Sequence, residues 1–141
     1  MLRDVVIGPF LSITFDVQHV LESKGLDSNS RISLVDSCTL FRTFLRVESE
    51  QNTYNISTGD VMEVAFSHTL SMAPDKDKSL GDEYDIVTLA HVICKTMKED
   101  KLILSLSSGS DFIELSTREQ VPLQEGANVY ILFRFLEIFD T

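Results

Sequence analysis

Residues Ser79-Leu80-Gly81-Asp82-Glu83-Tyr84-Asp85-Ile86-Val87 join an acidic turn directly to a long run of strand-forming residues. Gly and Asp favour turns because glycine tolerates positive φ and the Asp carboxylate bonds to nearby backbone N–H groups. Branched and aromatic residues favour a pleated, half-buried surface. The stretch therefore predicts an exposed turn followed by a strand over 84–97.

Outside this stretch, apolar and polar residues alternate with the period of two that marks a half-buried strand. The alternation is clearest in Leu11, Ile13, Phe15 and Val17, and it returns in later runs, while all six glycines fall between runs. No segment has the pattern of an amphipathic helix. The sequence predicts strands at about 10–20, 30–37, 39–48, 61–70, 84–97, 101–107, 111–116 and 127–138.

A chain of 141 residues with 43% hydrophobic and 24% charged residues is typical of one globular domain, here residues 1–141. An antiparallel sheet of eight strands removes its exposed edges most simply by closing into a barrel. The predicted fold class is thus all-β, an eight-stranded antiparallel barrel. Residues 71–83 form the longest predicted connection, a mobile acidic loop.

Five segments together resemble the eighth common subunit of eukaryotic nuclear RNA polymerases I, II and III. The first is the stretch 79–87, and the others are Phe15-Asp16-Val17, Asp27-Ser28-Asn29-Ser30-Arg31-Ile32, Val64-Ala65-Phe66-Ser67-His68-Thr69-Leu70 after Gly59-Asp60, and Val129-Tyr130-Ile131-Leu132-Phe133-Arg134. The resemblance covers roughly Leu11 to Leu136. Ile13-Thr14-Phe15 stands where the family usually has Asp-Ile-Phe, so the chain is identified as a divergent member.

This resemblance implies an OB-like barrel and a function without catalysis. It implies a structural subunit, shared by the three nuclear polymerases, that docks on the largest subunit, contacts neighbouring subunits, and supports assembly and transcription. The implied location is nuclear, in nucleoplasm and nucleolus.

Two predicted strands are apolar on both faces, although a small barrel buries only one. In 127–138, Ile131 and the residues that alternate with it, such as Val129 and Phe133, are predicted to face inward. Leu132 and its alternating neighbours, Tyr130 and Arg134, are predicted to face outward. In 84–97, Ile86, Ala90, Val92 and Cys94 are predicted to lie on one side, and Val87, Leu89, Ile93 and Met97 on the other. The outer face is either covered by the chain itself or is a docking surface. The candidate interface residues are Tyr130, Leu132, Arg134, Leu89 and Tyr84, and Leu132→Asp is expected to fold but not to assemble.

The second candidate class is a stand-alone OB-type protein that binds single-stranded nucleic acid. Its contacts would be Lys24, Arg31, Arg42 and Phe44, with Phe41 and Arg46 nearby. A formal net charge of −10 disfavours nucleic-acid and membrane surfaces, because binding to phosphates needs clustered cations. Any such binding is expected to be weak and nonspecific, with Arg46 paired instead to acidic residues such as Glu48.

No catalytic, cofactor-binding or metal site is predicted, and no enzymatic activity, small-molecule substrate or membrane contact. His19, His68 and His91 have no second ligand at metal-binding spacing, and no Gly-x-Ser-x-Gly or phosphate-binding glycine loop occurs. A third class, a lipocalin-like carrier, is disfavoured because the inward residues are large and apolar. Cys38 and Cys94 are expected to be reduced in an intracellular protein.

Overall fold

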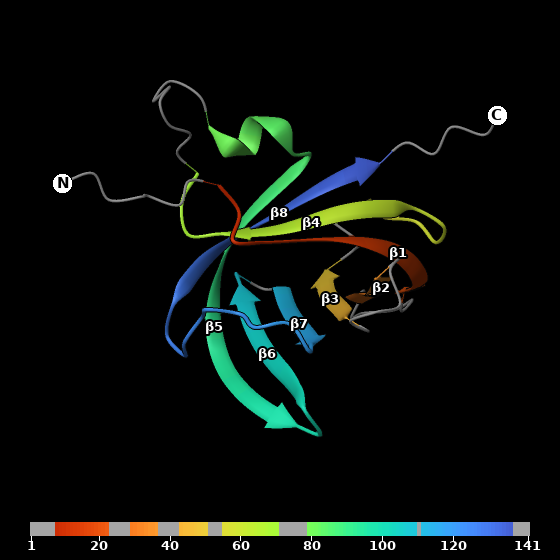
Figure 1. The fold of residues 1–141 in the computed structure, drawn as a ribbon. Helices are drawn as coiled ribbons and strands as arrows, with labels where there is room; N and C mark the ends of the chain where they lie inside the picture. Colours follow the sequence, from red (N-terminus) through yellow and green to blue (C-terminus); the bar gives the residue numbers. More distant parts are fainter. Residues whose placement is uncertain are drawn as a thin grey trace.

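The computed structural model describes residues 8–22, 29–36, 43–50, 55–70, 79–109 and 111–136 (Figure 1). The described chain is antiparallel and all-β, as the alternation predicts, with one short 3-10 helix. The elements are β1 (Leu11–Glu22), β2 (Asn29–Asp36), β3 (Phe44–Glu50), β4 (Val61–Ser67), η1 (Leu80–Glu83), β5 (Ile86–Lys98), β6 (Lys101–Ser108), β7 (Asp111–Thr117) and β8 (Asn128–Leu136).

The strands form a closed ring in the order β1-β2-β3-β7-β6-β5-β8-β4. The pairing of Leu11–Asp16 with Val61–Phe66 joins β1 to β4 and closes it. Strand β8 lies between β5 and β4, and it pairs antiparallel with both. Sequence neighbours therefore make only part of the ring, and the rest depends on pairings between distant strands.

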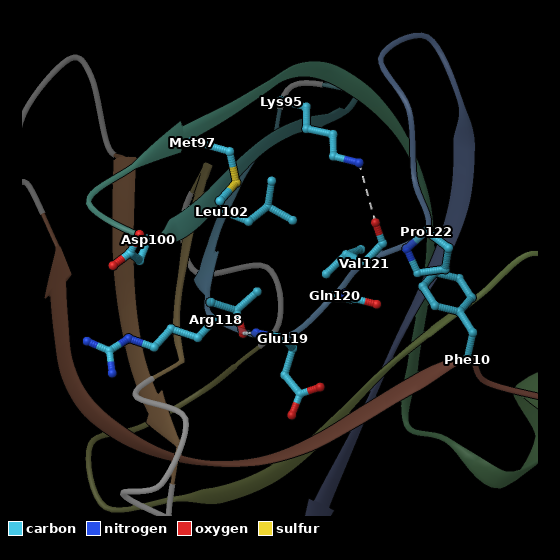
Figure 2. Close-up of a pocket in the computed structure, with 11 residues that line it drawn as sticks. Phe10, Lys95, Met97, Asp100, Leu102, Arg118, Glu119, Gln120, Val121 and Pro122 are labelled. Carbon is cyan, nitrogen blue, oxygen red and sulfur yellow. Dashed lines mark hydrogen bonds between the residues drawn. The ribbon is translucent and has the colours of Figure 1, made fainter.

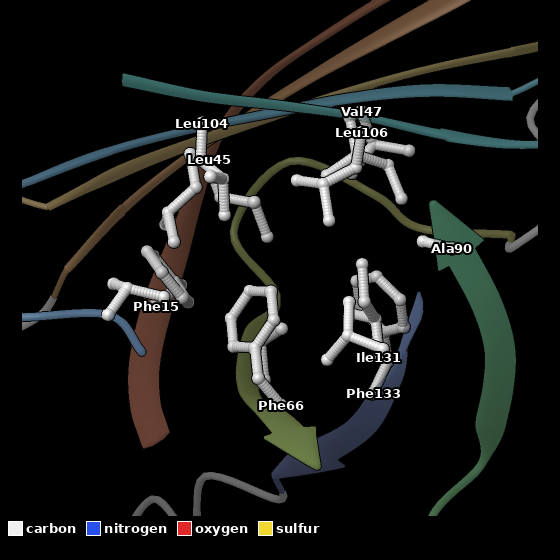
Figure 3. Close-up of a cluster of buried hydrophobic side chains, with 14 of the residues drawn as sticks. Phe15, Leu45, Val47, Phe66, Ala90, Leu104, Leu106, Ile131 and Phe133 are labelled. Carbon is white, nitrogen blue, oxygen red and sulfur yellow. The ribbon is translucent and has the colours of Figure 1, made fainter. Parts of the chain in front are cut away.

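Inward-facing side chains fill the barrel. Leu45, Leu104 and Leu115 lie on adjacent strands in register, and Phe66 lies opposite Ile131. All of them belong to one interior cluster and are fully or almost fully buried, and Figure 3 shows Leu45, Leu104, Phe66 and Ile131 converging there with Phe15 and Phe133. Burying one such side chain is worth about 1.5–3 kcal/mol, so this cluster is the main source of stability.

Several predicted boundaries shift. The predicted strand 39–48 is described only from Phe44 onward, since 37–42 lie outside the described residues, as do 71–78 of the predicted loop and 137–138 of the last strand. Strand β4 ends at Ser67 and not at residue 70, because the Ser67 hydroxyl turns the chain by donating to the Thr69 carbonyl oxygen, 2.7 Å away. Strand β5 begins at Ile86 because Tyr84 is the C-terminal cap of η1.

A bulge in β5 reverses the predicted facing of its second half. The register with β6 shifts between Val92 and Cys94, so that Cys94 pairs with Ser105 and Met97 with Leu102. Met97 thus shares the register of the buried Leu102 but is 69% exposed at the barrel end, and Cys94 lies on the same side as Ser105. The prediction that Cys94 shares a side with Ala90 and Val92 is wrong, because a bulge adds one residue to a strand and inverts the alternation beyond it.

Candidate protein-binding face

The candidate interface residues lie together on the outer face of β4, β8 and β5. Tyr130 of β8 is opposite Ser67 of β4 and Leu89 of β5. Two residues further along β8, Leu132 lies between Ala65 of β4 and Val87 of β5. Two residues beyond that, Arg134 lies opposite Glu63 of β4. Cross-strand neighbours on one face are within contact distance, and the structure thus brings four predicted residues, Tyr130, Leu132, Arg134 and Leu89, onto one surface.

Leu132 faces outward as predicted, but it is not accessible. Its side chain is 0% exposed, because Leu80 of η1 packs over it with Ala65. Figure 1 shows η1 outside the barrel, next to the beginning of β5 and to β8. The prediction that Leu132 is free to contact a partner is therefore wrong. The chain covers this part of its own surplus apolar face.

The cover is held by the polar residues of the opening stretch. Ser79 Oγ accepts a hydrogen bond from Gly81 N, and Asp82 Oδ2 accepts one from Ser79 N, both at 3.2 Å, so Ser79 and Asp82 form a capping box. Leu80 N donates to Leu70 O at 2.6 Å. A capping box satisfies backbone donors that a helix start leaves unpaired, and here it fixes Leu80 above Leu132.

Tyr84 connects this cover to the ion pair beneath it. The Arg134 guanidinium lies 5.5 Å from the centre of the Tyr84 ring, and Arg134 Nη2 is 2.5 Å from Glu63 Oε2. Burial is the main cause that raises the pKa of the Tyr84 phenol above its ordinary value, with smaller contributions from Glu63 and Glu83, while Arg134 opposes the rise. Both predicted interface residues, Tyr84 and Arg134, are half-buried in this intramolecular network.

Asp85 has a structural role. Its backbone N–H donates to Phe133 O and its carboxylate accepts from Phe135 N, both at 2.8 Å. Backbone and side chain therefore bind β5 to the end of β8. The stretch 79–85 is thus a structural clamp across β8, in which the carboxylates of Asp82 and Asp85 accept backbone hydrogen bonds.

The accessible part of the face lies on β5. Val87, Leu89 and Ile93 are 39%, 52% and 51% exposed, with His91 exposed between them. We call Val87, Leu89 and Ile93 the β5 stripe. Of these, only Leu89 was among the predicted interface residues. Val87 and Ile93 carry the same signal, an apolar residue of outward parity, and the alternation alone could have added them.

The predicted nucleic-acid contacts are described only in part. Lys24 and Arg42 lie outside the described residues, and Arg31 is placed in β2 by its backbone, opposite Glu48. Phe44 is 41% exposed, with Lys101 Nζ 4.8 Å from its ring centre. The nearby Arg46 forms ion pairs with Glu48 and Glu114, at 3.7 and 3.2 Å, as the sequence led us to expect for Glu48.

A pocket of about 770 Å³ opens at one end of the barrel, beside the part of β5 that follows the bulge (Figure 2). The bulge turns Lys95 inward, where Nζ donates to Leu123 O at 2.8 Å and approaches Val121 O at 3.5 Å. The pocket wall includes two cations and two carboxylates. Its lining residues are Phe10, Lys95, Met97, Asp100, Leu102, Thr117, Arg118, Glu119, Gln120, Val121 and Pro122.

The pocket lining contains neither a histidine nor a cysteine, and so lacks the most common general base and the most reactive nucleophile. Across the described residues, no three His, Cys, Asp or Glu side chains are arranged to hold a metal ion. Nor does any described helix have the length and hydropathy to cross a bilayer. Of the arrangements in the described part, the outer face of β5 is the one best suited to binding.

No protein-family model matches this chain, and a search of curated proteins finds no match either.

Proposed function

We propose that this protein is a non-catalytic structural subunit of nuclear DNA-directed RNA polymerases I, II and III that docks on the largest subunit. The observation that carries the proposal is the stretch Ser79–Val87, which resembles the eighth common subunit over nine consecutive residues. Its side chains here form one structural unit, with a capping box, a buried Leu80 and an Asp85 bound to β8. Because several residues of this stretch have defined structural contacts, their resemblance to the family supports the proposal better than a similar amino-acid composition would.

The barrel supports the proposal in its general form. An antiparallel ring filled with side chains has the architecture expected of an OB-like accessory subunit. The proposal includes the OB likeness, the mobile acidic loop predicted at 71–83, and a location in nucleoplasm and nucleolus. The exposed apolar stripe beside an intramolecular cover is consistent with a part that functions by contact.

The test is purification of the tagged full chain from its own cells at low salt, with mass spectrometry of the chains that accompany it. We expect the largest subunits of nuclear polymerases in amounts comparable to the bait. The control is the same tag on a variant unfolded by Ile131→Asp, since Ile131 is buried in the core. Recovery of the bait without any polymerase subunit overturns the proposal.

One observation favours the second class. The exposed Phe44 with Lys101 above its ring resembles the aromatic and cationic pairs on which OB barrels stack bases. Fluorescence anisotropy of a labelled single-stranded oligonucleotide tests it at 0.05 and 0.2 M salt. Binding that persists at the higher salt and is lost in Phe44→Ala supports the nucleic-acid-binding class. Binding that disappears at the higher salt reflects only nonspecific electrostatic attraction to the phosphates.

A further inference from the structure

The β5 stripe is unusually exposed for large apolar side chains. Val87, Leu89 and Ile93 are each at least 39% exposed, while the neighbouring Leu132 is fully covered by Leu80. Ile93 lies six positions after Val87, a length of about 20 Å at roughly 3.3 Å per residue, and the exposed His91 lies between Leu89 and Ile93. Exposed apolar residues gathered on one face in this way mark a site of protein contact.

Carboxylates lie at both ends of the stripe. Asp82 and Glu83 are exposed on η1, close to Val87, whose Cγ2 would be 3.1 Å from a Cβ added to Gly81. At the other end, the exposed Glu125 accepts a hydrogen bond from the backbone N–H of Lys95, two residues beyond Ile93. The stripe is therefore apolar except for His91, and carboxylates lie near both of its ends.

The cations near the stripe are engaged elsewhere. Arg134 is paired with Glu63, and the Lys95 ammonium donates to a carbonyl oxygen of the loop at the barrel end. Neither one neutralises the terminal carboxylates of the stripe. With a net charge of −10 on the whole chain, the surface favours a basic partner and disfavours a second copy of this protein.

The backbone of the stripe is already occupied. Ile86–His91 pairs with β8, His91–Lys98 pairs with β6, and Ser108 Oγ donates to the Leu89 carbonyl oxygen at 2.9 Å. A partner must consequently pack on side chains, and a helix is an element that covers the face of a sheet in this way without needing its backbone groups. At 1.5 Å per residue, a helix of about 14 residues spans the roughly 20 Å of the stripe, and long side chains at its two ends extend toward the carboxylates beyond it.

We propose that the β5 stripe binds an amphipathic helix of a partner protein, about 14 residues long, with an apolar face and Lys or Arg near both ends. This inference rests on the proposed function, since the helix would belong to another polymerase subunit. It specifies the chemistry of the docking site, which the resemblance alone does not.

The probe is a synthetic 14-residue helical peptide with a Leu face and two Lys at each end, titrated into the isotope-labelled full chain. We expect saturable binding, with NMR shift changes concentrated on Val87–Ile93. Leu89→Ser should weaken binding about tenfold, because one buried Leu contact is lost. Leu21→Ser is the matched control, since Leu21 is 62% exposed on β1, and it should leave the affinity unchanged.

The charge requirement has its own comparison. Glu83→Lys should weaken binding, whereas Asp16→Lys, the same charge change at an exposed position of β1, should not. A second peptide with Glu in place of the terminal Lys should bind at least about tenfold more weakly. Equal loss in both charge variants, or equal binding of both peptides, contradicts the acidic ends as determinants.

Three outcomes overturn the inference: no saturable binding, binding that Leu89→Ser leaves intact, or concentration-dependent dimers that Leu89→Ser abolishes, which would make a second copy the occupant. The fate of the proposed function is separate. If the Leu89→Ser variant co-purifies with the polymerase as well as the wild type, the stripe is not the docking site but the subunit assignment stands. If the peptide binds and no polymerase chain co-purifies, the stripe stands and the subunit assignment does not.

Discussion

Leu80 packs over Leu132 on the outside of the barrel. A side chain that the alternation of β8 directs to solvent is thereby as buried as the core residues on the opposite face. The barrel has a second, smaller core, made by a single turn of helix, and the stability of this core depends on the polar residues that hold the turn in place.

Leu132→Asp should unfold the isolated protein. An unpaired carboxylate beneath Leu80 costs several kcal/mol, a large part of the 5–15 kcal/mol that stabilises a typical domain. Leu132→Ala should lower the free energy of unfolding by about 2–5 kcal/mol. Thermal unfolding followed by circular dichroism measures both. Leu89→Asp, on the exposed stripe, is the control and should change the melting temperature by only a few degrees; an equally stable Leu132→Asp would mean that the cover is absent in solution.

Loss of the capping box should loosen the cover. Ser79→Ala and Asp82→Ala each remove one hydrogen bond of the box and should each cost about 0.5–2 kcal/mol in denaturant unfolding. The double variant should cost less than the sum, because the two residues act as one unit. Glu83→Gln changes a neighbouring acid that has no part in the box and should stay within about 0.5 kcal/mol of the wild type.

The effect of Gly81→Ala on the free energy of unfolding should depend on the side chain at residue 87. A Cβ at residue 81 would lie 3.1 Å from Val87 Cγ2, closer than a comfortable contact. In the wild type this crowding offsets the gain of about 0.4–1 kcal/mol that Gly→Ala brings through the unfolded state, but in a Val87→Ala background the gain should appear in full. Gly109→Ala should destabilise in both backgrounds, because Gly109 has a φ of 61°. The measurement is the unfolding free energy of the wild type, Gly81→Ala, Val87→Ala and the double variant. Identical effects of Gly81→Ala in both backgrounds would contradict the contact between residue 81 and Val87.

Tyr84 should make the protein sensitive to alkali. Since burial raises the pKa of the phenol in the folded state, the folded protein holds this proton more tightly than the unfolded chain does. The contribution is fully present below the ordinary pKa of about 10 and is lost as the pH rises through the folded pKa. Melting temperatures from pH 8 to 11 should fall more steeply for the wild type than for Tyr84→Phe. Parallel curves would show that the phenol is solvated.

Lys95→Met should release the loop at the barrel end. The Lys95 ammonium donates to Leu123 O, and this bond, with the longer contact to Val121 O that Figure 2 draws, fastens the loop to β5. Hydrogen exchange at Leu123 and Gly126 should be faster in Lys95→Met, with a smaller effect on strands β6 and β7. Lys98→Met, at an exposed position of the same strand, should leave these rates unchanged.

The sequence predicts well what depends on local alternation. The runs 101–107 and 111–116 appear as β6 and β7, with Leu102, Leu104 and Leu106 of β6 buried, and Ile131 is buried as predicted. Even the outward parity of Leu132 is correct. Alternation reports on which side of the sheet a residue lies, and for most strands this determines burial.

Two features could not be predicted this way. The cover of Leu132 depends on Leu80, 52 positions earlier, which no local pattern connects to β8. The β5 bulge inserts one residue between Val92 and Cys94, where no glycine or proline marks it, and it reverses every facing that follows. The pocket at the barrel end and the inward Lys95 depend on this bulge and were accordingly missed.

The place of β8 in the ring has a consequence for biosynthesis. Strand β4 needs β8 as its second neighbour, and β8 ends at Leu136, 69 residues after β4 ends. A nascent chain that emerges from the ribosome thus presents one edge of β4 without a partner until almost the whole barrel has been translated. Unpaired edges of this kind are prone to aggregate, and long-range pairings are slow to form. The hairpin β1-β2 and the meander β5-β6-β7 can assemble early, but the ring closes last, and a chaperone that binds the waiting edge of β4 would be most useful in that interval.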